Sequence, residues 1–192
     1  MHGLLGPGHD LPSDAADASP ATSASSMLVR PPRRAGRQQF TARDVVSRWD
    51  TLELGRRATA RAAADVLDRL AERMPFEVRA ISIDNGSEFM AEFETACAAR
   101  GIRLFVLPPR SPKLHGAVER ANRTHTEEFY EVTTAEPDLE SFRVELRAWE
   151  TVYNTIRPHR ALGYLTPAEY LAWIGVTVQR TYRTRTPPVA GQ

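Results

Sequence analysis

The chain has 192 residues, of which 42% are hydrophobic and 26% are charged, and its formal net charge is +1. This composition excludes collagen-like, mucin-like and wholly disordered proteins, and the near-zero charge excludes a histone-like protein that binds DNA by bulk charge. A single cysteine, Cys97, excludes an internal disulfide, and the lack of any long apolar run or signal-peptide pattern predicts a cytoplasmic protein that does not enter a membrane.

Composition divides the chain into three segments. Residues 1–38 are rich in Gly, Pro, Ala and Ser and become basic toward their end, so we expect them to be disordered. Residues 39–174 have the composition of one globular domain, and residues 175–192 read as a basic extended tail. The positive net charge comes from the ends, because residues 40–174 hold 18 basic and 21 acidic residues.

The first half of the domain predicts two strands, a helix and a third strand. Residues 40–46 and 49–54 are typical of two strands joined by a short turn. Residues 59–74 place their apolar side chains on one face at helical spacing, and Pro75 ends this helix. Residues 78–83 form a short apolar strand that stops at a turn sequence, Asp-Asn-Gly-Ser.

The second half predicts one more strand and further helices. A helix from residue 88 stops near Gly101, and residues 102–107 form a strand. The prolines of residues 108–112 require a loop. Helical spacing returns in residues 114–131 and 139–154. Strands that alternate with helices predict an α/β domain.

Two carboxylates are candidates for chemistry. Asp84 follows a strand directly, which is where open α/β sheets place ligand-binding groups, although Asp in such turns is commonly a turn former. Glu119 lies on a helix, where a glutamate is usually a solvated surface residue. Taken together, a carboxylate at a strand end and a second on a following helix can share Mg²⁺ or Mn²⁺ in phosphoryl transfer.

The charge around Glu119 is compatible equally with contact to a phosphate backbone and with a surface ion-pair pattern. Glu119 is the only acid among residues 100–126, which carry six basic residues. The prolines of this stretch make an exposed loop that carries Arg110 and leads into Lys113, the one lysine of the chain.

A second dense motif is Tyr-Asn-x-x-Arg-Pro-His-Arg-Ala-Leu-Gly-x-x-Thr-Pro-Ala-Glu, residues 153–169. Its Arg157 and His159 are candidates for phosphate contacts or for capping of helix ends, and Thr166 with Pro167 predicts the start of a last helix. The five histidines of the chain form no metal-binding cluster.

Three motifs resemble the catalytic core of the retroviral-integrase-like D-D-E transposases of bacterial insertion sequences. They are I-D-N-G-S-E-F at 83–89, S-P-K-L-H-G-A-V-E-R-A-N-R at 111–123, and the stretch at 153–169. The resemblance implies a ribonuclease-H-like mixed sheet flanked by helices, and Mg²⁺- or Mn²⁺-dependent strand transfer on DNA. Carried over by position, Asp84 and Glu119 are catalytic, metal-binding carboxylates, and Lys113, Asn122 and Arg123 approach DNA.

One departure from the family pattern concerns the first carboxylate, which the family carries on the first strand of the sheet. Residues 23–37 stand in that place and contain no Asp or Glu. Asp44 and Asp50 lie on later strands and are weak candidates to replace it. We therefore expect an N-terminally truncated or frame-disrupted copy whose first strand is missing or replaced, and whose enzymatic activity is in doubt.

Three hypotheses about function follow. The leading one is an integrase-core transposase that acts on transposon ends and target DNA, as a homo-oligomer or beside a full-length transposase, and is inactive if no third carboxylate exists. The alternative is a non-catalytic DNA-binding or oligomerising fragment that modulates a full-length transposase. The third is an α/β domain with no nucleic-acid role.

Overall fold

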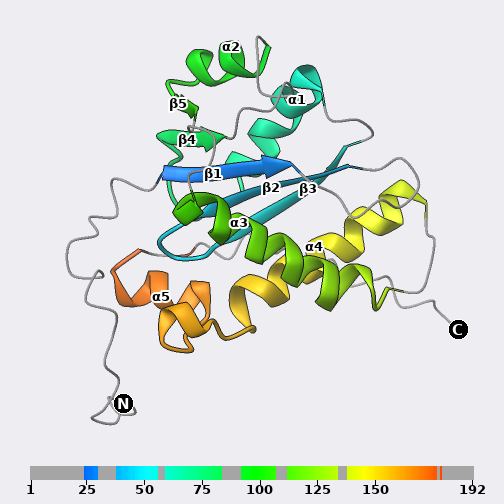
Figure 1. Cartoon of the computed structure of the whole chain (residues 1–192), viewed down its shortest axis with the longest axis vertical. Coiled ribbons are helices and arrows are strands. Elements are labelled where there is room, and N and C mark those ends of the chain that lie inside the picture. The colour runs from blue at the N-terminus through cyan, green and yellow to red at the C-terminus, as the bar shows by residue number, and fades with distance from the viewer. Residues whose placement is uncertain are drawn as a thin grey trace, which may run out of the picture.

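A computed structural model describes residues 24–29, 38–55, 59–83, 92–106, 112–133, 138–176 and 178. Its centre is a five-stranded mixed sheet with the order β3-β2-β1-β4-β5. Helices α1 and α2 lie on one side of this sheet and α3 and α4 lie on the other (Figure 1), while Leu171 of α5 packs into the core on the α1 and α2 side. The predicted α/β architecture is confirmed.

The predicted hairpin is formed by β2 (Gln38–Asp44) and β3 (Asp50–Gly55), which pair antiparallel. Asp44 closes its turn: the carboxylate oxygen Oδ2 accepts hydrogen bonds from the backbone N–H of Ser47 at 2.8 Å and from its hydroxyl at 2.6 Å. The next residue, Arg48, has a left-handed backbone with φ 61°. Local turn chemistry therefore fixes the register of the hairpin.

A first strand is present, so of the expectation that it is missing or replaced, the alternative that it is missing is wrong. Ala24–Val29 forms β1, which pairs antiparallel with β2 and parallel with β4 (Ala80–Ile83). These six residues have no proline and no charge, so both of their backbone edges can bond inside a sheet. Within residues 1–38, for which we predict disorder, this strand and Gln38, the first residue of β2, are described, and the rest lies outside the described residues.

On one face of the sheet, α1 (Ala60–Ala71) and α2 (Glu92–Ala99) cover the main hydrophobic core. The Thr59 hydroxyl caps α1, and Phe93 and Cys97 of α2 are fully buried. Gly101 ends the second helix with φ 68°, as predicted, and the edge strand β5 (Arg103–Val106) follows.

On the other face, α3 (Pro112–His125) continues as a π-helical turn, Thr126–Tyr130, and α4 (Leu139–Thr155) begins at the Asp138 cap. Regular helical spacing would put Tyr130 on the same side as Glu119 and Arg123, which are exposed, but Tyr130 is not exposed. The wider π-helical turn rotates the following side chains, so Tyr130 is buried and its hydroxyl donates to the Gln39 side chain.

The last helix, α5 (Pro167–Trp173), starts where the sequence predicts it. Thr166 and Glu169 bond each other's backbone N–H groups in a capping box, with Pro167 at the first helical position. Val176 and Val178, at the start of the segment predicted as a basic tail, pack against the main core. Within the described ranges, no helix is long and apolar enough to span a membrane.

Side chains satisfy the outer edge of β3. The Leu52 N–H donates to Glu150 Oε2 at 2.6 Å, and the Leu52 carbonyl accepts from the Arg73 guanidinium at 2.8 Å. Glu150 comes from α4 and Arg73 follows α1, so both helical layers contribute to this edge. The sheet therefore ends at β3 with its backbone groups paired.

Candidate nucleic-acid interface

The two predicted carboxylates lie on different parts of the structure. Asp84 follows the last residue of β4 and lies outside the described residues. Glu119 is exposed on α3 and forms no ion pair with any described residue. The helix that carries it packs against β1, which is the neighbour of β4.

Neither candidate for the third carboxylate is available to a metal ion. Asp44 is 1% exposed and uses one oxygen in its own turn. Asp50 is fully buried, and both of its carboxylate oxygens have a partner. Oδ1 lies 3.0 Å from Arg43 Nε, and Oδ2 lies 3.0 Å from His125 Nε2. Throughout the described residues, no three His, Cys, Asp or Glu side chains form a metal-binding group.

Asp50 is the centre of a buried polar network that joins the hairpin to α3 and α4. The Trp149 indole N–H donates to His125 Nδ1 at 3.0 Å, so His125 Nε2 carries the proton that it donates to Asp50. The Arg43 guanidinium also donates to the Tyr153 hydroxyl at 2.6 Å. Asp50 and His125 have no exposed surface, so this network holds the hairpin against α3 and α4.

Among the predicted DNA contacts on α3, Lys113 lies in the first turn of the helix, whose backbone alone is described there. Asn122 Oδ1 accepts from the Thr41 hydroxyl at 3.1 Å, so this amide fastens α3 to β2. Arg123 is exposed and pairs with Glu127 at 2.7 Å. Arg110 lies outside the described residues.

The two predicted contacts of the second motif have different environments. Arg157 forms a bidentate pair with Glu128, at 2.6 and 2.8 Å, and this hydrogen bonding lowers the pKa of the Glu128 carboxyl. His159 is 6% exposed, and burial lowers its pKa to about 4. Its uncharged ring donates from Nε2 to the Tyr153 carbonyl oxygen at 3.3 Å, so His159 brings no positive charge at neutral pH.

A pocket of about 590 Å³ opens where α3, the β2–β3 turn and the segment after α4 meet. We call it the arginine pocket, because five arginines line it: Arg43, Arg48, Arg120, Arg157 and Arg160. None of its lining residues is Asp or Glu. Sequence reasoning missed this site, since residues from near positions 45, 120 and 160 converge only in the folded chain.

Comparisons with known proteins agree on one resemblance. Residues 100–167 match the family described as integrase core domain. The insertion element IS407 uncharacterized 31.7 kDa protein of Burkholderia multivorans is 31% identical over 113 residues, which are 57% of this chain and 39% of that protein. The chain thus spans about two fifths of the length of this curated relative.

The fold is similar to that of a solved structure. The crystal structure of the catalytic core domain of BIV integrase superposes with a TM-score of 0.62 at 24% identity, covering 79% of this chain and 95% of that chain. The predicted ribonuclease-H-like fold is therefore confirmed, and so is the predicted resemblance to integrase-like transposases.

Proposed function

We propose that this chain, whose residues 100–167 match the integrase core domain, binds DNA in the transposition of an insertion element and does not itself transfer strands. Support for the DNA role comes from the matched segment, from the insertion-element relative and from the basic residues that surround Glu119. Neutralisation of phosphates by such residues gives affinity without sequence preference.

The proposal that the chain does not transfer strands is carried by one observation, the lack of a carboxylate in β1. This strand lies at the centre of the sheet, beside β4, and contains no carboxylate. Two-metal phosphoryl transfer needs several hard oxygen ligands around Mg²⁺ or Mn²⁺. Asp84 and Glu119 leave that set one carboxylate short, and Asp44 and Asp50 are used internally. The residues present do not fit a complete site, so we derive no catalytic step through a metal.

Fluorescence anisotropy at several salt concentrations tests the proposed DNA binding, with a labelled duplex that carries the end of the insertion element. We expect salt-dependent binding that weakens in the variant Lys113→Gln/Arg123→Gln, with the salt slope falling by roughly 1.8 because two phosphate contacts are lost. Arg61→Gln, which removes an exposed arginine of α1 on the opposite side of the sheet, is the control. A duplex that does not bind at all would overturn the proposal.

The catalytic half is tested with Mn²⁺ and the same duplex. We expect no nicking or joining by the natural chain. Mn²⁺-dependent cleavage that disappears in Asp84→Asn would contradict this expectation and establish autonomous catalysis.

A gain of function tests the reason for the missing activity. Ser25 and Ser26 of β1 pair with Ile81 and Ser82 of β4, close in sequence to Asp84. We expect Ser25→Asp or Ser26→Asp to confer Mn²⁺-dependent nicking, and Asp84→Asn to abolish it again. If both variants fold, by circular dichroism, and neither nicks DNA, the lack of a carboxylate on β1 is not the cause.

A further inference from the structure

The arginine pocket has more positive charge than its surroundings neutralise. Arg43 pairs with Asp50, and Arg157 pairs with Glu128. The other three arginines, Arg48, Arg120 and Arg160, form no ion pair with any residue in the described ranges. Three uncompensated guanidinium groups thus converge on one cavity, where they favour an anionic ligand.

Arg48 lines this cavity with one guanidinium nitrogen unpaired. It is partly buried, and its Nε atom is inaccessible to solvent and has no hydrogen-bond partner. Burial, and then the charge of Arg43, lower the pKa of Arg48. A bound anion would satisfy the guanidinium and relieve both effects.

The backbone of the pocket is strained at two lining residues. Arg48 has φ 61° and Tyr164 has φ 68°, and across the described residues these are the non-glycine residues with positive φ. A left-handed backbone is unfavourable for residues with a Cβ atom, and such strain concentrates at ligand-binding sites. Both residues line the arginine pocket, so the fold maintains this strain at one place.

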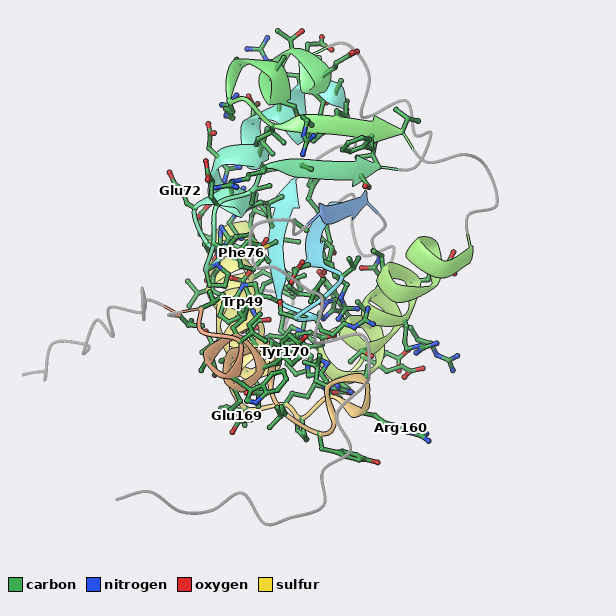
Figure 2. All side chains as sticks on the ribbon, turned by 90° about the vertical axis from the view of Figure 1, so that its left-hand side faces the viewer. Trp49, Glu72, Phe76, Arg160, Glu169 and Tyr170 are labelled. Atoms are coloured by element: carbon green, nitrogen blue, oxygen red, sulfur yellow. The ribbon has the colours of Figure 1, made fainter. Side chains whose placement is uncertain are left out.

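The size and the rim of the pocket indicate the form of the anion. Its volume of about 590 Å³ lies in the range of pockets that bind small molecules. A duplex, with its bases paired inside, is too wide to enter. Tyr164 is 66% exposed, and Figure 2 shows the Arg160 side chain extending outward from the fold. An exposed aromatic ring among guanidinium groups is the arrangement that holds single strands, with bases stacked on the ring and phosphates on the cations.

We propose that the arginine pocket binds the backbone of an unpaired DNA strand, with phosphates on Arg48, Arg120 and Arg160 and a base on Tyr164. This inference rests on the proposed DNA-binding function and specifies which form of DNA one region of the protein takes. Duplex DNA remains a ligand of the exposed face of α3, and Arg48 and Arg160 lie outside that helix, so mutation of these two residues separates the two surfaces.

The test compares a labelled single-stranded 12-mer with the same sequence as a duplex, both by anisotropy on the full chain. In Arg48→Gln/Arg160→Gln we expect affinity for the single strand to fall at least tenfold and its salt slope to fall by roughly 1.4, since each lost contact changes the slope by about 0.7. Duplex binding should change less than threefold, and Arg61→Gln is the matched loss of one exposed arginine elsewhere.

A second variant separates binding from folding. Glycine adopts positive φ without strain, so Tyr164→Gly should keep or raise the melting temperature while weakening the single strand at least threefold. A merely structural Tyr164 would leave single-strand affinity unchanged, which would overturn the stacking role.

Each remaining outcome decides between the proposals. Equal loss of single strand and duplex in Arg48→Gln/Arg160→Gln, or no loss of either, overturns the pocket but leaves the DNA-binding function standing. A natural chain that binds neither form overturns both. Displacement of the single strand by micromolar deoxyadenosine monophosphate would assign the pocket to free nucleotides and overturn the strand proposal.

Discussion

The side-chain amide of Asn154 bonds both backbone groups of Asp50. Asn154 Oδ1 accepts from the Asp50 N–H at 2.9 Å, and Asn154 Nδ2 donates to the Asp50 carbonyl at 2.7 Å. A side chain of α4 thereby takes the place that a neighbouring strand would occupy beside β3. The asparagine of the Tyr-Asn-x-x-Arg-Pro-His motif thus acts in the architecture of the sheet.

Replacement of Asn154 by alanine should destabilise the fold. Two buried backbone groups of Asp50 would lose their partners, each at about 1–3 kcal/mol. We expect the free energy of unfolding, measured by urea denaturation, to fall by about 2–4 kcal/mol. Val144→Ala, at a position of α4 that is 69% exposed, is the control and should change it by less than about 0.5 kcal/mol. Equal stability of the two variants would contradict this role for Asn154.

Replacement of Asp50 by asparagine should be at least as severe. The carboxylate of Asp50 is shared by Arg43 and His125, and all three side chains are buried. Its loss leaves the Arg43 guanidinium in the interior without a counterion, which costs about 3–5 kcal/mol. The double variant Asp50→Asn/Arg43→Met should recover part of this loss in the same urea experiment. If it recovers nothing, the pairing is not what makes Asp50 important.

The stability of the protein should fall in acid through His159. Burial lowers the pKa of this ring to about 4 in the folded state, below the ordinary value of 6.5. The unfolded chain therefore takes up a proton first, so the contribution of His159 to stability is complete above pH 6.5 and is lost as the pH falls to about 4. Melting temperatures of the natural chain and of His159→Phe, measured from pH 7 to pH 4, should show a smaller decrease in the variant. Parallel curves would exclude His159 as a source of this pH dependence.

Cys97 should react with thiol reagents only when the protein unfolds. The side chain is fully buried, and burial raises the pKa of its thiol to about 11, so the reactive thiolate is scarce at neutral pH. Since Cys97 is the single cysteine, the rate of modification by 5,5′-dithiobis(2-nitrobenzoic acid) reports the opening of the core directly. We expect modification in 6 M guanidinium chloride to be at least about a hundredfold faster than in buffer. Rapid reaction in buffer would contradict the burial of α2 against the sheet.

Much of this fold could be predicted from local sequence signals. The hairpin, the amphipathic α1, the Gly101 stop and the Thr166 capping box each depend on residues that lie a few positions apart. Such signals can be recognised in a single sequence because the interactions that they reflect join residues close together in the chain.

What the sequence did not predict depends on distant partners. The strand β1 has a weak apolar pattern of its own and forms because β2 and β4 pair with both of its edges. The bonds between Asn154 and Asp50 join residues 104 positions apart, and the arginine pocket is built from three such distant segments. The predicted roles of Asp84 and Glu119 follow from the family resemblance and remain predictions.

Because side chains already bond the outer edge of β3, a further strand cannot easily add to the sheet at that end. Glu150, Arg73 and Asn154 occupy the hydrogen-bonding positions that an incoming strand would need there. At the opposite end, β5 borders the sheet with Phe105 and Val106 about half exposed. We therefore expect strand exchange or amyloid-like stacking that recruits the sheet to start at β5, where a charged residue in addition to Arg103 should oppose it.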